Sequence, residues 1–231
     1  MLTKDKGRLK MKKKEILDKG FVILLDYLAS DNDVAQAARV STGTKSEPGK
    51  DTKLIHFLIA HRHETPFEHL IFRFHIKCPF FVARQWMRHR VASYNEVSAR
   101  YRAVTDEFYV PAHEDIPECF NEQDIARYRT TLEESYEVYS DLLEKVKDNK
   151  VHRARAREVF RGLLGTAYYT EFYWTINFRS LMNFIALRTD PTAQLEIRRY
   201  AEAIKEMIKD IIPVTLEAFE ENVLSKKGTH E

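Results

Sequence analysis

The chain has 231 residues, of which 44% are hydrophobic and 31% are charged, and its formal net charge is +2. This balance is typical of a globular protein that is long enough to bury a core of its own. No apolar run approaches the roughly 18 residues of a membrane span, and the basic N-terminus lacks the apolar core of a signal peptide. We therefore expect a cytoplasmic protein without a membrane partner, in which Cys78 and Cys119 are reduced thiols.

The positive charge is concentrated at the N-terminus. Residues 1–14 hold seven lysines and arginines against one aspartate, so the remaining residues sum to −4. A nucleic-acid-binding protein that is basic throughout would not show this distribution. We expect residues 1–10 to be a disordered basic extension and residues 11–231 to fold as one domain, because no repeat or low-complexity linker divides them.

The first half of the chain predicts short helices and half-buried strands. One or two strands are expected over residues 16–29 around an Asp-Lys-Gly turn, followed by helices over 31–40, with Ser30 or Asp31 as N-cap, and over 51–62. Residues 69–78 alternate between apolar side chains and Arg73, His75 and Lys77, which indicates a strand with one polar face. Pro79 ends this strand, and a helix is expected over 80–89.

The second half predicts longer helices. Apolar residues recur at spacings of three and four over 122–147, the stripe of an amphipathic helix. Further elements are expected in this order: a helix over 152–164, an aromatic strand over 167–177, a helix over 179–188, and a helical pair over 191–224 broken near Pro213. The predicted fold is α+β, a largely antiparallel twisted sheet packed with helices, with long amphipathic helices in the C-terminal half. A doubly wound sheet is disfavoured, because strands and helices do not alternate regularly.

Residues 84–102 are the segment that carries chemistry. Five arginines and a histidine crowd into it with Glu96 as the one acid, and Ser93, Asn95 and Ser98 add small polar groups. Arginine forks suit phosphate, and so many positive charges repel one another unless an anion lies between them. The residue types predict a site for a nucleotide-sized polyanion. A solvated basic face and a nucleic-acid surface with stacking Trp86 and Tyr94 are the alternatives.

Residues 88–101 read Arg-His-Arg-Val-Ala-Ser-Tyr-Asn-Glu-Val-Ser-Ala-Arg-Tyr. This stretch resembles the signature of the flavin-dependent thymidylate synthases, R-H-R-x-x-S-x-N-E-x-S-x-R-Y, at every fixed position. Residues 63–69 resemble the upstream flavin-contacting segment of that family, and residues 174–188 resemble its downstream segment. The similarity spans nearly the whole chain, although Gly165 stands in a stretch where the family often carries a proline.

The resemblance implies an enzyme that makes dTMP from dUMP. Methylenetetrahydrofolate would supply the one-carbon unit, reduced FAD would supply the hydride that completes the methyl group, and NADPH would reduce the flavin. Members of the family are homotetramers whose active sites are built from several subunits, so the resemblance implies self-association as well.

The resemblance also assigns residues to each ligand. Those assigned to dUMP are Gln85, Arg88, Glu96, Ser98, Arg100, Arg161 and Arg188. Those assigned to FAD are His63, Thr65, Glu68, Arg88, His89, Arg90, Glu96, Asn177, Arg179 and Asn183. Arg188 is the catalytic assignment, because a guanidinium beside the uracil ring favours the anionic form of the ring's amide.

Other interpretations of these residues are weaker. Ser98 suits a hydrogen-bond donor to substrate better than a nucleophile, because no adjacent base is evident to activate it. His61, His63 and His69 lie close together, but their spacing is not that of a zinc hydrolase, so no metal is expected. The alternating residues Tyr168 to Ile176 are expected to be core rather than a cofactor platform.

Overall fold

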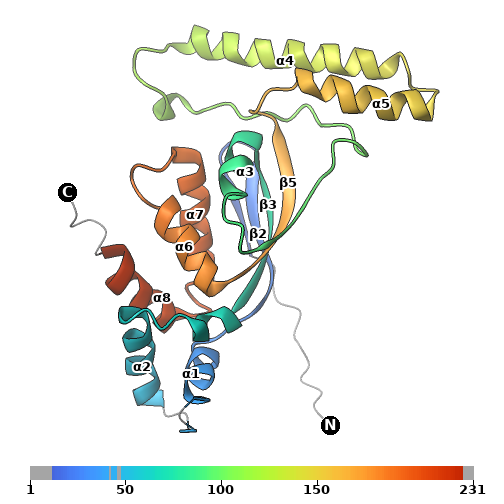
Figure 1. Cartoon of the computed structure of the whole chain (residues 1–231). Helices are drawn as coiled ribbons and strands as arrows, with labels where there is room; N and C mark the ends of the chain where they lie inside the picture. Colours follow the sequence, from blue (N-terminus) through green and yellow to red (C-terminus); the bar gives the residue numbers. More distant parts are fainter. Residues whose placement is uncertain (1–11, 42, 46–47, 226–231) are drawn as a thin grey trace.

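The computed structural model describes residues 12–41, 43–45 and 48–225, and its centre is a five-stranded antiparallel sheet (Figure 1). The strands are β1 (Lys12–Ile16), β2 (Gly20–Leu28), β3 (Ile71–Pro79), β4 (Ser93–Glu96) and β5 (Tyr169–Asn177), in the order β1-β2-β3-β5-β4. The α+β prediction is confirmed. The basic extension expected over residues 1–10 lies outside the described residues.

The first two strands form a hairpin around the predicted Asp-Lys-Gly turn. Ile16 pairs with Gly20 at its closed end, and Gly20 has no room for a side chain, because a Cβ there would collide with the Tyr200 hydroxyl and with backbone oxygens. The hairpin therefore fixes β1 at one edge of the sheet, where helix α7 (Leu195–Ile208) packs against both of its strands.

Helices cover one face of the sheet. Helices α3 (Phe80–Trp86), α6 (Phe178–Arg188) and α7 lie together on that face (Figure 1). Phe72, Phe74 and Ile76 of β3 point into them and are fully buried, and Phe172, Trp174 and Ile176 of β5 are at most 2% exposed. The alternating residues from Tyr168 to Ile176 that were predicted to be core are thus buried, whereas Tyr173 on the other face of the strand is exposed.

The opposite face of the sheet is polar, but His75 and Lys77, which were predicted to lie on it, have charged partners. Arg73 is exposed, whereas His75 bonds Glu171 of the neighbouring strand at 3.0 Å. Lys77 was expected on the polar side, yet it is only 8% exposed, because the 103–109 loop brings Glu107 to within 2.7 Å of its Nζ. A charge buried in this way is tolerated because it is paired.

The remaining helices form two groups. At one end of the sheet lie α1 (Asp31–Arg39), α2 (Pro48–Ala60), the 3₁₀ turn η1 (Thr65–His69), α8 (Pro213–Phe219) and a π-helical turn, η4 (Glu220–Leu224). At the other end α4 (Glu122–Glu144) and α5 (Lys150–Phe160) lie side by side as an arm (Figure 1), followed by the short turn η3 (Arg161–Leu163). A further short turn, η2 (His113–Asp115), precedes α4.

Several boundaries differ from the sequence-based expectations. Ser30, not Asp31, is the N-cap of α1, since its Oγ accepts the Asp33 amide at 3.2 Å. The helix expected over 80–89 ends at Trp86, and the strand β4 was not predicted. Its polar residues carry no apolar alternation, and it forms because its backbone pairs with β5 from Thr175 to Phe172.

Candidate functional site

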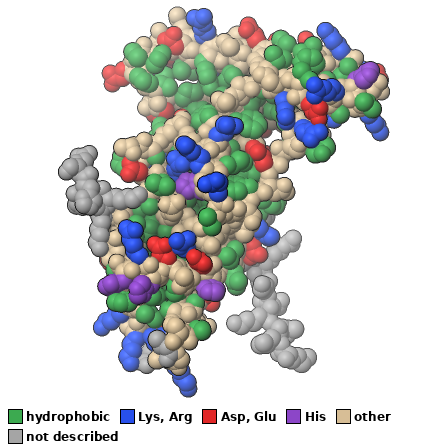
Figure 2. All heavy atoms as spheres, viewed as in Figure 1, with side chains coloured by type: hydrophobic (Ala, Val, Ile, Leu, Met, Phe, Trp, Pro, Cys, Tyr) green, Lys and Arg blue, Asp and Glu red, His purple; other side chains and the backbone are tan. Residues whose placement is uncertain are grey.

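A cavity of about 1010 Å³ opens beside α6, between the ends of α2 and η1 and the turn that follows α3. Its polar lining is dominated by cations: Arg62, Arg88, Arg90, Arg179 and Arg188, with His89, Asn183, Ser180, Asn222 and Glu64. Figure 2 shows basic side chains gathered in the middle of the corresponding face of the molecule. Of the described residues, five arginines and one carboxylate line the cavity, which favours an anionic ligand.

The cavity also has an apolar wall. Phe67, Met182 and Phe219 are buried side chains that line it, together with Ile59 and Ala186. A cavity that combines an apolar wall with a few converging polar groups is the usual form of a cofactor site. Its volume and its arginines fit a dinucleotide, whose rings need the apolar wall and whose pyrophosphate needs the cations.

Arg188, at the C-terminal end of α6, is held by two hydrogen bonds from its guanidinium. Its Nε donates to His89 Nε2 at 3.1 Å, and its Nη2 donates to the backbone oxygen of Gln85 at 3.1 Å. Burial, and then the charge of Arg88, lowers the pKa of Arg188 below its usual value. Among the described residues no carboxylate pairs with Arg188, Arg88 or Arg90, so this group of cations is electrostatically uncompensated.

His89 is the neutral member of this group. Its ring is 9% exposed and meets the Phe184 ring edge-on at 5.0 Å. Burial, and then the neighbouring Arg188 guanidinium, lowers the pKa of His89 from 6.5 to about 4. The ring is therefore neutral at physiological pH. Its Nε2 accepts the hydrogen bond from Arg188 Nε–H, and its Nδ1 carries the proton of the neutral imidazole.

The turn that carries these residues is fixed by β4. The Tyr94 hydroxyl donates to the backbone oxygens of Trp86 at 3.2 Å and His89 at 2.9 Å. The His89 amide donates to the Trp86 oxygen at 3.0 Å. The unpredicted strand thus positions the arginines of residues 88–90.

The residues assigned to FAD divide between the cavity lining and its surroundings. Arg179 pairs with Glu64 at 3.0 Å and with Glu68 at 3.5 Å. Asn177 caps α6, because its Oδ1 accepts the Ser180 amide at 2.9 Å. Five of the ten assigned residues line the cavity: Arg88, His89, Arg90, Arg179 and Asn183. The other five, His63, Thr65, Glu68, Glu96 and Asn177, lie outside its lining.

The residues assigned to dUMP fall into two groups. Arg88 and Arg188 line the cavity, and Gln85 touches Arg188 through its backbone. Glu96, Ser98, Arg100 and Arg161 do not line it. The Glu96 carboxylate accepts the Thr170 hydroxyl at 2.7 Å, and Arg100 pairs with Glu158 of α5 at 2.7 Å. Within one chain the second group therefore lies outside the cavity, and of its members Arg100 and Arg161 are connected to the α4–α5 arm.

Sequence reasoning missed several residues of the site. Arg62 and Glu64 line the cavity, and Gln194 bonds the Gln85 side chain. Glu64 could have been found, because it lies in the same short segment as His63 and Thr65. Gln194 lies 109 residues from Gln85 in the sequence, and no local pattern links the two.

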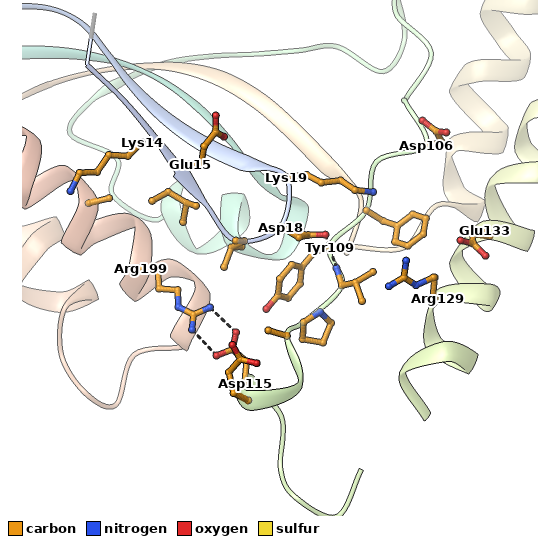
Figure 3. Close-up of a pocket in the computed structure, with 18 of the residues that line it drawn as sticks. Lys14, Glu15, Asp18, Lys19, Asp106, Tyr109, Asp115, Arg129, Glu133 and Arg199 are labelled. Carbon is orange, nitrogen blue, oxygen red and sulfur yellow. Dashed lines mark hydrogen bonds and ion pairs between the residues drawn. The ribbon is translucent and has the colours of Figure 1, made fainter. Parts of the chain in front are cut away.

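A second cavity, of about 1300 Å³, lies between the β1–β2 hairpin, α7 and α4 (Figure 3). Arg199 bonds both oxygens of Asp115 there at 2.6 Å. Its other charged lining is mostly acidic: Glu15, Asp18, Asp106, Glu114, Glu133, Glu137, Glu202 and Glu206, against Lys14, Lys19 and Arg129. This excess of carboxylates repels a phosphate, so the smaller, cationic cavity is the candidate nucleotide site.

The histidines considered for a metal site lie near the cationic cavity. His61 Nδ1 is 2.9 Å from the backbone oxygen of Phe57, and the rings of His61 and His63 are 6.4 Å apart. In residues 12–41, 43–45 and 48–225 no three His, Cys, Asp or Glu side chains are grouped to hold a metal ion. Nor does any helix in these ranges have the length and apolar character to cross a membrane.

Comparison with known proteins gives a consistent result. The family described as "Thymidylate synthase complementing protein" matches residues 23–214. The flavin-dependent thymidylate synthase of Pseudothermotoga lettingae is 45% identical over 207 residues, 89% of this chain and 92% of that protein. The enzyme of the same name from Thermosipho melanesiensis is 46% identical over 219 residues, with the same coverage of 89% and 92%.

A solved structure agrees in fold. The UMP/dUMP methylase PolB from Streptomyces cacaoi, bound with 5-Br dUMP, superposes with a TM-score of 0.77 at 33% sequence identity. The match covers 90% of this chain and 97% of that one.

Proposed function

Because the chain belongs to the family of flavin-dependent thymidylate synthases, we propose that it converts dUMP to dTMP at the cationic cavity. Methylenetetrahydrofolate is the proposed carbon donor, FAD the bound cofactor and NADPH its reductant, with the cytoplasm as the compartment. The observation that carries the proposal is the group Arg88, Arg90 and Arg188, which no described carboxylate neutralises, beside a neutral His89.

The cavity residues fit FAD by their chemistry. Arg88, Arg90 and Arg179 supply positive charge for a pyrophosphate, and Asn183 supplies an amide that can donate and accept. Phe67 and Met182 give the apolar wall against which a ring system can pack. When bound, the reduced flavin supplies the hydride that completes the methyl group, and the protein supplies binding and orientation.

Arg188 is the proposed catalytic residue. Its guanidinium is partly buried and pairs with no carboxylate of residues 12–41, 43–45 and 48–225, so a nearby anion would interact with it strongly. Placed against a uracil ring, it stabilises the deprotonated amide of the ring and so raises the electron density at the carbon that accepts the one-carbon unit. His89 and the Gln85 oxygen hold it in place for this task.

We further propose that the site is completed by a second copy of the chain in a homotetramer. Ser98, Arg100 and Arg161 suit a phosphate dianion, yet they lie outside the cavity of their own chain. Arg100 pairs with Glu158 of α5, and Arg161 caps the C-terminal end of that helix. An arm that projects from the sheet (Figure 1) can bring these residues to the cavity of a neighbouring subunit. In that arrangement Ser98 donates a hydrogen bond to the substrate and does not act as a nucleophile.

The test is an absorbance spectrum of the purified protein followed by titration of its flavin bands with dUMP. We expect a yellow protein whose bands shift with dUMP and not with dAMP or dGMP, because the two ligands would share one site. A colourless protein that neither takes up added FAD nor responds to dUMP contradicts the proposal. Tight, steeply salt-dependent binding of DNA or RNA by such a protein would instead assign the arginines to nucleic acid.

A further inference from the structure

The helix α2 ends in a backbone turn that suits glycine. The His63 amide donates to the Leu58 oxygen at 2.8 Å. The Arg62 amide donates to the Ile59 oxygen at 3.2 Å. These two hydrogen bonds form a Schellman motif, in which the first residue beyond the C-cap takes the left-handed backbone conformation and is usually glycine. Here that residue is Arg62, with a φ of 57°, so its Cβ strains a turn that glycine would make freely.

Packing accounts for the other non-glycine residue with a positive φ among the described residues. Leu17, in the β1–β2 hairpin, has a φ of 62°, and its side chain packs against the main hydrophobic core. The Arg62 side chain is exposed, and no hydrogen bond or ion pair holds it in residues 12–41, 43–45 and 48–225. Neither packing nor pairing within the described chain therefore explains why an arginine stands at this position.

Arg62 lines the cationic cavity. Glu64 is the one carboxylate among the described residues of that lining, and it pairs with Arg179 at 3.0 Å. Arg62 therefore joins the arginines of residues 88–90 and Arg188 as a cation that no described carboxylate neutralises. An anionic ligand stabilises such a cation, and the planar fork of an arginine suits a phosphate.

We propose that Arg62 is a further cofactor-binding residue, which supplies a positive charge to the phosphates of the bound dinucleotide, and that this gain in binding offsets the strain at the end of α2. The inference rests on the proposed function, because it takes FAD as the ligand of the cavity. In this role Arg62 acts on the affinity for FAD and not on the chemical step. Since the contact is between exposed charges, it weakens as salt is added.

The test compares three variants of Arg62. Arg62→Gly removes both the guanidinium and the strain, Arg62→Ala removes the guanidinium and keeps the strain, and Arg62→Lys keeps both a positive charge and the strain. One measurement is the dissociation constant of FAD, from fluorescence titration of the flavin-free protein at low and at high salt. The other is the thermal midpoint of the flavin-free protein.

We expect Arg62→Gly and Arg62→Ala to raise the dissociation constant of FAD by about tenfold at low salt, the lower end of the range for one hydrogen bond to a charged group. The increase should be smaller at high salt. Arg62→Lys should bind FAD more tightly than Arg62→Ala, because it keeps the charge. The thermal midpoint should rise in Arg62→Gly alone, by about 2 °C, because only glycine relieves the strain.

Dissociation constants of FAD that stay unchanged in Arg62→Gly and Arg62→Ala overturn the inference, and the proposed function survives because the unaltered protein still binds FAD. Equal thermal midpoints for Arg62→Gly and Arg62→Ala overturn the claim that binding offsets strain at this position. If the unaltered protein binds no FAD at either salt concentration, the proposed function falls and the inference falls with it.

Discussion

At the scale of single residues, the site depends on Arg88, Arg90 and Arg188, three cations with which no carboxylate of the described residues pairs. Arg188 is the clearest case, since its two described hydrogen-bond acceptors, the His89 ring and the Gln85 oxygen, are both neutral. The lowered pKa of Arg188 reflects the cost of this arrangement, which an anionic ligand would offset. Residues of this kind are recognisable in the sequence by their type, but their lack of partners is visible only in the fold.

Replacement of Arg188 by alanine should separate catalysis from cofactor binding. We expect Arg188→Ala to lower turnover by about a thousandfold, the scale of one lost electrostatic contact to a developing charge. Flavin should stay bound, because Arg88, Arg90 and Arg179 remain. Single-turnover kinetics and the flavin absorbance per subunit measure the two effects. Loss of the flavin, or turnover near that of the unaltered protein, would contradict the role assigned to Arg188.

His89 should make stability depend on pH. Its pKa is about 4 in the folded chain and 6.5 as an ordinary histidine, so the unfolded chain takes up the proton first as the pH falls. The contribution of the neutral ring is therefore complete above pH 6.5 and is lost progressively as the pH falls toward 4.

We expect the unfolding free energy of the flavin-free protein to fall between pH 7 and pH 5 by about 1 kcal/mol more than that of His89→Gln, after allowance for solvent around the ring. Urea titrations at the two pH values measure this difference. His61→Gln is the control, because His61 is exposed. An equal pH effect in the unaltered protein and His89→Gln would show that His89 does not titrate as described.

At the scale of secondary structure, local patterns predicted the elements that have one apolar face. The strand β3 and the helix α4 lie within a few residues of the expected ranges. The strand β4 could not be predicted, because its pairing partner Thr175 lies about 80 residues away and its own side chains are polar. The same limit applies to Lys77, which is buried by a partner from a distant loop.

The contact between α1 and α8 makes a contribution to the unfolding free energy that can be measured. Asp31, in the first turn of α1, accepts hydrogen bonds from the Thr215 amide at 2.8 Å, the Thr215 hydroxyl at 2.6 Å and the Val214 amide at 3.1 Å. These amides are at the N-terminus of α8, where a negative charge is favourable. Asp31→Ala should therefore lower the unfolding free energy by about 2 kcal/mol.

Ser30→Ala is the matched control for Asp31→Ala. It removes only the cap within α1 and should cost about 1 kcal/mol. Urea unfolding of both variants measures the difference. Equal losses would mean that the link between α1 and α8 contributes nothing beyond an ordinary helix cap.

At the scale of the whole molecule, the chain places the assigned nucleotide residues in two regions. One group lines the cavity beside α6, and the other lies outside it, with Arg100 and Arg161 at the α4–α5 arm. The resemblance to the family assigned both groups of residues to dUMP. The spacing of these residues along the chain does not determine whether the two groups lie together within one subunit. Tyr173, on the sheet face opposite α6 and α7, is 49% exposed, so the described part of the chain leaves this side chain largely uncovered.

Mixing of two inactive variants tests whether the site is shared. Arg188→Ala removes a cavity residue, and Arg100→Ala removes an arm residue, so each pure variant should be nearly inactive. If every site takes its cavity from one subunit and its arm residues from another, random hybrids contain some sites in which both arginines are intact. Statistical mixing makes these about a quarter of all sites.

We therefore expect co-refolding of the two variants in equal amounts to restore about a quarter of the activity of the unaltered protein. The recovery should appear only after subunits exchange, which gel filtration of differently tagged chains can follow. Mixtures that form hybrids yet stay inactive would show that Arg100 and Arg188 act within the same chain, because a site confined to one subunit keeps its defect in every hybrid.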